Sequence, residues 1–278
     1  MKEGKDCENN LTRKIFIPSY LYGSALNTPS PYEQQALHEL AAWQQKMQRN
    51  PTLVNRLTQK IQDRLNRIIP EKVHRLITAT IKQMVRGVLF GAKLTTAEPK
   101  PFRSLEDREQ AVRQRIRIYR TTAAAEGGIT GAGGILLGMT DFPLLLAIKI
   151  KLLFDIAALY GYPVSDYKER VYILYIFQLA FSSQQTRNEV YRQVARWNLT
   201  CRELPDDIQQ FDWRSFQQEY RDYIDIAKMA QLVPVIGAPV GAVANWGLIK
   251  RLGDTAMNAY RLRWQRGHLM EQAPEMIC

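Results

Sequence analysis

The sequence is poor in the residues from which metal and redox sites are built. It contains only 3 cysteines in 278 residues, at Cys7, Cys201 and Cys278, and no Cys-x-x-Cys pair. Because these thiols are few, scattered and odd in number, a zinc ribbon, a thioredoxin-type site and a disulfide framework are excluded. The 3 histidines share no metal-ligand spacing. We therefore expect no metal site, and the sequence leaves any cofactor unknown.

Common catalytic and targeting motifs are also missing. No Gly-x-Ser-x-Gly nucleophile elbow and no His-Glu-x-x-His occurs. The glycine-rich stretch at 127–138 lacks the Gly-Lys-Ser/Thr of a P-loop. Residues 1–10 are charged and contain no apolar run behind a basic flank, so no signal peptide is visible. We predict a cytoplasmic location, peripheral to the inner face of the membrane, and leave open whether the protein is an enzyme.

Apolar residues recur at helical spacing along most of the chain, and strand signals are few. The fold is predicted to be all-α, a multi-helix bundle-like single domain with glycine-striped, tightly packed central helices. We assign residues 1–30 to a flexible lead-in, 31–268 to the helical domain and 269–278 to a tail. Helices are expected to begin near residues 31, 51, 70 and 104, and to span about 142–160, 166–180, 186–198, 213–232 and 240–266.

Two stripes of small residues mark the apolar parts of the chain. Four glycines are spaced 4, 3 and 4 residues apart, which places them on one face of a helix. Each glycine costs about 1 kcal/mol of helix stability relative to alanine, so a close helix–helix contact is the expected compensation. A second segment repeats the spacing of four residues at Gly237 and Gly241. The two stripes are predicted to lie in tight helix contacts. The glycines concerned are Gly127, Gly131, Gly134, Gly138, Gly237 and Gly241.

Positive charge is concentrated in the first part of the chain. The whole sequence carries 38 basic and 27 acidic residues, a net charge of +11. By count, residues 1–120 hold 22 basic and 11 acidic residues, whereas residues 121–278 hold 16 of each, so the entire excess lies in the first part. A basic helical face would favour an anionic membrane surface, and a solvated helix surface is the alternative. The expected contacts are Arg56, Lys60, Arg64 and Arg67.

Two apolar segments have nearly the length of a membrane span. Met229–Ile249 contains no charged residue, but it includes two prolines and three glycines. The segment 127–148 contains a single acid, Asp141, followed closely by Pro143. A carboxylate in the middle of a span is costly, which argues against simple spans. Buried core helices, shallow insertion and true spans remain the alternatives.

Three polar residues stand out within these apolar segments. Glu126 directly precedes the first glycine stripe, Asp141 follows it, and Asn245 lies within the second apolar segment. A carboxyl group in apolar surroundings is a candidate for acid–base chemistry because burial raises its pKa. The structural alternatives are an N-cap at Asp141 for a helix beginning at Phe142, a buried salt bridge for Glu126 and a buried hydrogen bond for Asn245.

Several short motifs, in their order and spacing, resemble those of the EcsC family. The likeness runs from about Tyr32 to Arg263 and covers most of the chain. The motifs are Tyr32-Glu33 to Trp43, Ile69-Pro70-Glu71, Glu126-Gly127-Gly128 with Thr130-Gly131, Asp141-Phe142-Pro143, Tyr160-Gly161-Tyr162, and Val233-Pro234-Val235-Ile236-Gly237-Ala238 with Asn245.

The resemblance implies a bacterial protein that is cytoplasmic or peripheral to the membrane. The family's namesake is encoded beside the ATPase and membrane subunits of an ABC transporter, which implies an accessory role in a membrane process. The family has no assigned chemistry, so no catalytic residue is carried over. Glu126, Asp141 and Asn245 match its recurring polar positions.

Three functional hypotheses follow. The first is a non-enzymatic, membrane-associated helical protein whose partner is an anionic membrane surface or a membrane protein. The second is a hydrolase-type enzyme that uses Glu126 and Asp141 in a buried cleft. The third is nucleic-acid binding through arginine-rich helices, which the charge alone neither requires nor excludes. No small-molecule ligand can be named from the sequence.

Overall fold

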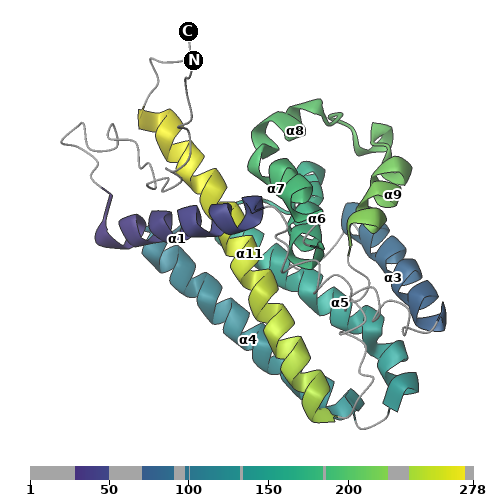
Figure 1. The fold of residues 1–278 in the computed structure, drawn as a ribbon. Helices are drawn as coiled ribbons and strands as arrows, with labels where there is room; N and C mark the ends of the chain where they lie inside the picture. The colour runs from purple at the N-terminus through teal and green to yellow at the C-terminus, as the bar shows by residue number, and fades with distance from the viewer. Residues whose placement is uncertain are drawn as a thin grey trace, which may run out of the picture.

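The computed structural model describes residues 29–49, 71–90, 98–99, 101–131, 134–183, 186–224 and 238–272. Within these ranges the chain forms nine α-helices and one short 3-10 helix. No strand occurs there, and the only pairing of β type is an isolated bridge between Ser182 and Ile224. The all-α prediction is therefore confirmed for the part of the chain that is described (Figure 1).

The first helix begins near residue 31, as the sequence predicts. Helix α1 spans Pro31–Gln48, and Ser30 is its N-cap. The Ser30 hydroxyl accepts a hydrogen bond from the Glu33 backbone N–H, and the Glu33 carboxylate accepts one from the Ser30 N–H. This reciprocal capping box satisfies two backbone donors that the first turn would otherwise leave unpaired.

Helices α4 (Leu105–Gly131) and α11 (Ala238–Gln272) form the central pair. They run antiparallel, because contacts that move forward along α4 move backward along α11. Glu109 pairs with Arg261, Ile116 lies against Gly253, and Arg120 stacks on Trp246. A Cβ atom added at Gly253 would lie 2.6 Å from the Ile116 side chain, so this glycine permits the close approach of the two helices.

The predicted start of the helix near Phe142 is wrong, because α5 spans Gly134–Leu159. We expected a break at 140–143 and an N-cap at Asp141, but α5 begins eight residues before Phe142 and continues through Pro143. An internal proline loses one backbone hydrogen bond and is normally unfavourable. Packing of α5 against α3 (Glu71–Phe90), α4 and α11 offsets this cost, which local sequence signals cannot show.

The second half of the chain builds a smaller group of helices around α6. Gly161, at a φ of 91°, ends α5 as expected, and Asp166 caps α6 (Tyr167–Phe181). The single helix expected over 186–198 is instead two, α7 (Arg187–Ala195) and α8 (Trp197–Glu203). The change of direction at Arg196 places Trp197 in the core against the Tyr172 ring.

The last element of this group is α9 (Trp213–Tyr223), preceded by the 3-10 turn Ile208–Gln210. The expected helix over 213–232 is confirmed in its first half, and its continuation from residue 225 lies outside the described residues. The helix predicted from Pro51 also lies outside them.

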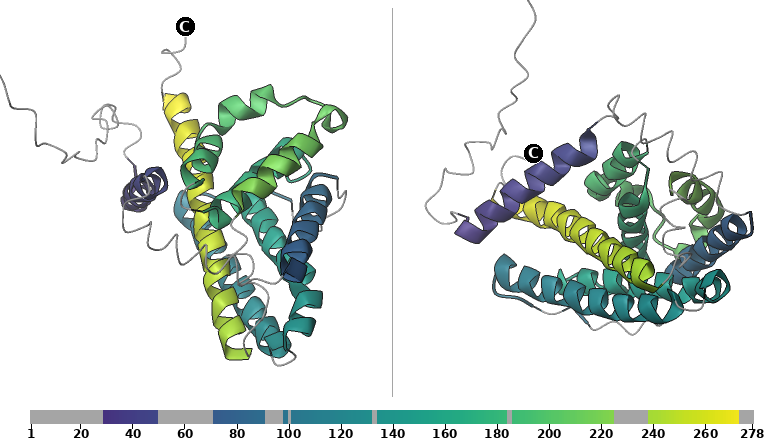
Figure 2. Two further views of the ribbon diagram at one scale, coloured as in Figure 1. Left: turned by 45° about the vertical axis from the view of Figure 1, so that its right-hand side comes forward. Right: turned by 60° about the horizontal axis from the view of Figure 1, so that its bottom comes forward.

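The core is one continuous apolar cluster between these layers. Helices α4 and α5 lie side by side, α11 lies across them, and α1 crosses α11 on its far side (Figures 1 and 2). Most residues of helix α6 are buried, and apolar side chains such as Val171, Ile173 and Phe177 are fully enclosed. Among the described residues, no helix has both the length and the apolar character needed to cross a membrane.

Candidate functional site

A buried ion pair joins the two central helices. The Arg261 guanidinium on α11 donates two hydrogen bonds to the Glu109 carboxylate on α4, at 2.5 Å to Oε1 and 2.6 Å to Oε2. It donates a third, of 2.9 Å, to Oε2 of Glu39 on α1. The Glu109 and Arg261 side chains are 0% and 2% exposed. The pair therefore fixes α1, α4 and α11 relative to one another.

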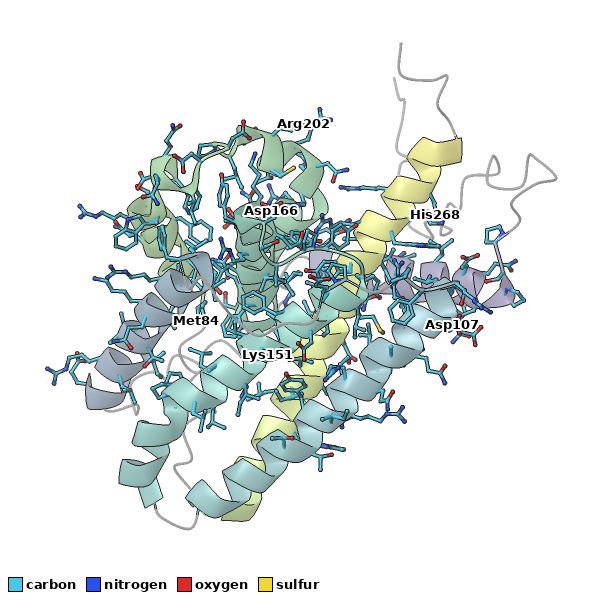
Figure 3. All side chains as sticks on the ribbon, turned by 180° about the vertical axis from the view of Figure 1, so that it is seen from behind. Met84, Asp107, Lys151, Asp166, Arg202 and His268 are labelled. Atoms are coloured by element: carbon cyan, nitrogen blue, oxygen red, sulfur yellow. The ribbon has the colours of Figure 1, made fainter. Side chains whose placement is uncertain are left out.

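Three further groups complete the surroundings of Glu109. The hydroxyls of Tyr32 and Tyr160 donate to its two oxygens at 2.5 and 3.0 Å, and Arg113 donates to the Tyr32 oxygen at 2.7 Å. Burial, together with the hydrogen bond to Glu109, raises the pKa of Tyr32 to about 12. Both tyrosines thus remain protonated donors at neutral pH. Figure 3 shows the labelled Asp107 and His268, which mark the ends of α4 and α11 nearest to this cluster.

A second buried carboxylate lies between α6 and α11. Glu169 accepts hydrogen bonds of 2.6 Å from the Tyr260 hydroxyl and from the Arg263 guanidinium. The Arg263 guanidinium lies 3.5 Å from the centre of the Tyr162 ring and 4.8 Å from that of Tyr172. Burial raises the pKa of Glu169 despite the charge of Arg263. This cluster joins the α5–α6 turn to α11.

A third carboxylate, Asp155, joins α4 to α5. It accepts a hydrogen bond of 2.9 Å from the Tyr119 hydroxyl, and Lys151 binds its other oxygen. Arg115 lies 3.7 Å away. All three carboxylates thus have two or more donors around them, which is how buried charges are accommodated in a stable core. Their arrangement among the described residues is that of helix-joining contacts.

A hollow lies directly beside the first ion pair. Its volume is about 640 Å³, and it is lined by residues of α1, α7 and α11 together with Leu179 of α6. Glu39 and Arg261 belong to both the ion pair and the hollow. Five basic side chains contribute to its lining: Lys46, Arg187, Lys250, Arg251 and Arg261. Its two acidic residues, Glu39 and Asp254, are engaged by Arg261 and Lys250 respectively.

The backbone places the polar residues singled out in the sequence, but their side chains lie outside the described part of the structure. Glu126 is in the last turns of α4, Asp141 is in α5 and not at its N-cap, and Asn245 is in α11. Glu126 and Asp141 thus belong to two helices that pack against each other. Their proposed cooperation as catalytic carboxylates stays a prediction.

The other predicted contacts are placed only in part. Arg56, Lys60, Arg64 and Arg67 lie outside the described residues, as does Gly237. Gly127 and Gly131 are in α4, Gly134 and Gly138 in α5, and Gly241 in α11. The prediction that the first four glycines share one face of a single helix is wrong, because α4 ends at Gly131 and α5 begins at Gly134. Both helices pack against α11, which carries Gly241. Contact between the glycines themselves stays a prediction.

Glu109 and Arg261 are not among the residues singled out from the sequence. A signal was present for Glu109, because it shares the buried face of α4 with Leu105, Val112 and Ile116 at spacings of 4, 3 and 4. An acid on an apolar stripe indicates a buried partner, although its identity cannot be read from the spacing. In the described ranges, no group of three or more His, Cys, Asp or Glu side chains is placed to hold a metal ion.

Fold and site together define a class of α-helical proteins whose helices are joined by buried ion pairs and which carry a basic hollow on one side. The EcsC protein family model matches residues 34–264, and the chain belongs to this family. The match coincides closely with the region over which the short motifs resemble it.

Two relatives come from Bacillus subtilis (strain 168). Protein EcsC is 39% identical over 231 residues, covering 83% of this chain and 95% of the relative. The uncharacterized protein YdbA is 28% identical over 264 residues, covering 87% of this chain and 96% of the relative. No solved structure matches the chain. The comparisons therefore establish the family and leave its biochemical activity unassigned.

Proposed function

We propose that the protein is a peripheral membrane protein that docks through the common end of α4, α5 and α11. The observation that carries the proposal is the convergence of three uncharged helix segments at one end of the molecule (Figures 1 and 2). These segments are 127–131 of α4, 134–140 of α5 and 238–249 of α11, and none contains a charged residue. Such an end suits shallow insertion rather than a span.

Residues at the border of this end have the character of a membrane interface. Trp246 is 49% exposed, and the Arg120 guanidinium lies 3.6 Å from the centre of its ring. Leu144 of α5 is 55% exposed, and Ile118 of α4 is 50% exposed. Tryptophan with a neighbouring cation is typical of the boundary between lipid tails and headgroups. Exposed cations near this border, Arg117 and Lys250, would favour anionic lipid.

The docking face predicted from the basic residues Arg56, Lys60, Arg64 and Arg67 would add to this attachment. The family resemblance further supports a role accessory to a bacterial ABC transporter or another membrane process. The basic docking face and the accessory role both require that the protein attaches to a membrane, so membrane attachment is tested first.

Liposome flotation of the purified full chain tests the docking proposal. We expect the protein to float with vesicles that contain phosphatidylglycerol, and flotation to persist in part at high salt because apolar insertion is not screened. Leu144→Glu should reduce flotation, since it places a charge at the inserting end. Leu199→Glu is the matched control, because Leu199 is an equally exposed leucine, at 58%, on α8 at the other end of the molecule.

The two variants separate membrane docking from general surface hydrophobicity. An equal loss of flotation for Leu144→Glu and Leu199→Glu would contradict docking through the α4–α5–α11 end. Failure of the unmodified protein to float with any vesicle, at low or high salt, would contradict membrane association itself.

A further inference from the structure

The hollow between α1, α7 and α11 is lined by a partly buried cation, Arg187, that has no counter-ion among the described residues. Arg187 is the first residue of α7 and lines the hollow. Its Nε atom is buried and has no hydrogen-bond partner, and no described carboxylate forms an ion pair with it. A guanidinium that is partly removed from water favours an anionic partner, because desolvation of an unneutralised charge is unfavourable.

The surroundings of Arg187 increase this demand for an anion. Burial, and then the positive charge of Arg251, lower the pKa of the Arg187 side chain. Arg251 has interactions of its own, so its contribution here is the positive field that it adds to the hollow. Lys46, exposed at the end of α1, lies on the border of the same hollow. Planar guanidinium groups bind phosphate oxygens especially well because their N–H donors match the geometry.

Asn258, which also lines the hollow, has a hydrogen-bond acceptor without a partner. Asn258 is only 9% exposed, and its Nδ2 donates to the backbone oxygen of Asp254. Its Oδ1 atom is buried and accepts no hydrogen bond. This oxygen needs a donor, so a phosphate ion alone cannot satisfy it, whereas a hydroxyl group can.

The spacing of these groups defines the shape of the ligand. Arg251 and Asn258 are seven residues apart on α11, so they share one face of the helix. Their Cα atoms are separated by about 10 Å along the helix axis. The volume of about 640 Å³ lies within the range of small-molecule sites. We propose that the hollow binds a phosphate-bearing polyol, with the phosphate at Arg187 in the positive field of Arg251 and a hydroxyl donating to Asn258 Oδ1. This inference does not depend on membrane docking.

Thermal unfolding and calorimetric titration of the full chain with glycerol 3-phosphate, inorganic phosphate and glycerol test the proposal. Glycerol 3-phosphate should bind and raise the melting temperature, inorganic phosphate should do so more weakly, and glycerol should have no effect. Arg187→Gln should weaken glycerol 3-phosphate binding about tenfold or more, in keeping with the loss of a charge-assisted contact. Asn258→Ala should abolish the preference for glycerol 3-phosphate over inorganic phosphate.

One variant and one control distinguish a ligand site from a structural contact. In the absence of ligand, Arg187→Gln should raise the melting temperature slightly, because it removes a partly desolvated charge that has no counter-ion, while it abolishes stabilisation by the ligand. Arg192→Gln, an exposed arginine on the same helix that does not line the hollow, should leave binding unchanged. The proposal is overturned if neither phosphate compound binds, or if Arg192→Gln and Arg187→Gln weaken binding equally.

A phosphate-bearing polyol can be a free metabolite or a lipid headgroup, and a competition experiment separates the two sources. If the source is a lipid, Arg187→Gln should reduce flotation with phosphatidylglycerol vesicles, and glycerol 3-phosphate should compete with them. If the source is a soluble compound, flotation should be the same for both proteins while calorimetric binding is lost in the variant. Both outcomes support the site, and absence of binding in both assays overturns it.

Discussion

Arg261 and Glu109 are 152 residues apart in the sequence and form a two-point ion pair with both side chains enclosed in the core. Burial by itself would lower the pKa of Arg261, but hydrogen bonds and charge from Glu109 and Glu39 outweigh it and raise the pKa. The guanidinium is thus permanently charged where α1, α4 and α11 meet. Stability, helix register and one border of the basic hollow all depend on this contact.

Replacing one member of the pair should be strongly destabilising. Arg261→Met leaves the Glu109 carboxylate buried without its main partner, and we expect a loss of about 3–5 kcal/mol in the free energy of unfolding. The double variant Glu109→Gln with Arg261→Met should recover part of this loss, because no uncompensated charge remains. Urea unfolding measures both changes. Arg202→Met, at an exposed position on α8, is the control and should change stability by less than about 0.5 kcal/mol.

Gly253 should be intolerant of any side chain. A Cβ atom there would lie 2.6 Å from two atoms of Ile116, so Gly253→Ala should separate α4 from α11 and cost about 1–3 kcal/mol. This loss opposes the gain of about 1 kcal/mol from higher helix propensity. Gly267→Ala on the same helix, where a Cβ meets nothing within 4 Å, should show only the gain. If Ile116→Ala fails to relieve the Gly253→Ala defect in thermal unfolding, the close contact is not the cause.

The contribution of Glu39 to stability should disappear in acid. Burial favours a raised pKa, but hydrogen bonds from Arg261 and Gln35 and the charge of Arg261 outweigh it, so the pKa is lowered from 4.5. The unfolded state therefore takes up a proton first, and the stabilisation present above pH 4.5 is lost as the pH falls through the folded-state pKa. Glu39→Gln should be less stable than the parent at pH 7, by under about 1 kcal/mol for this partly exposed pair, and equally stable in strong acid.

Denaturant unfolding over a series of pH values measures this effect. Glu203→Gln, an exposed glutamate at the end of α8, provides the comparison at each pH. A difference between Glu39→Gln and the parent that does not change with pH would contradict the assignment.

Arg263 should not be replaceable by lysine. Its guanidinium both binds Glu169 and lies over the Tyr162 ring, at 3.5 Å from the ring centre. Lysine keeps the charge but loses the planar stacking, and we expect a cost of about 1–2 kcal/mol. A double-mutant cycle with Tyr162→Leu measures the coupling between the two side chains. Additive effects in that cycle would show that the stacking contributes nothing.

Much of the fold could be predicted from local signals. The helices expected to begin near residues 31, 104 and 166 do begin there, where Ser30, Ser104 and Asp166 make capping contacts. Gly161 marks a helix end at a positive φ. The boundaries failed where packing overrides local preference, as at Pro143 inside α5 and at Arg196 between α7 and α8.

The sequence by itself determined that the chain is helical, where most helices begin, and to which family the chain belongs, because capping residues, apolar periodicity and ordered motifs are local properties. Only the tertiary structure decided which helices meet and which charges are buried together. Glu109, Arg261 and Glu39 are ordinary charged residues within their own helices, and Arg187 shares no motif with Asn258. Antiparallel packing of distant segments removes water from Glu109 and Arg261 and places Arg187 beside a hollow. No local pattern in the sequence specifies these contacts.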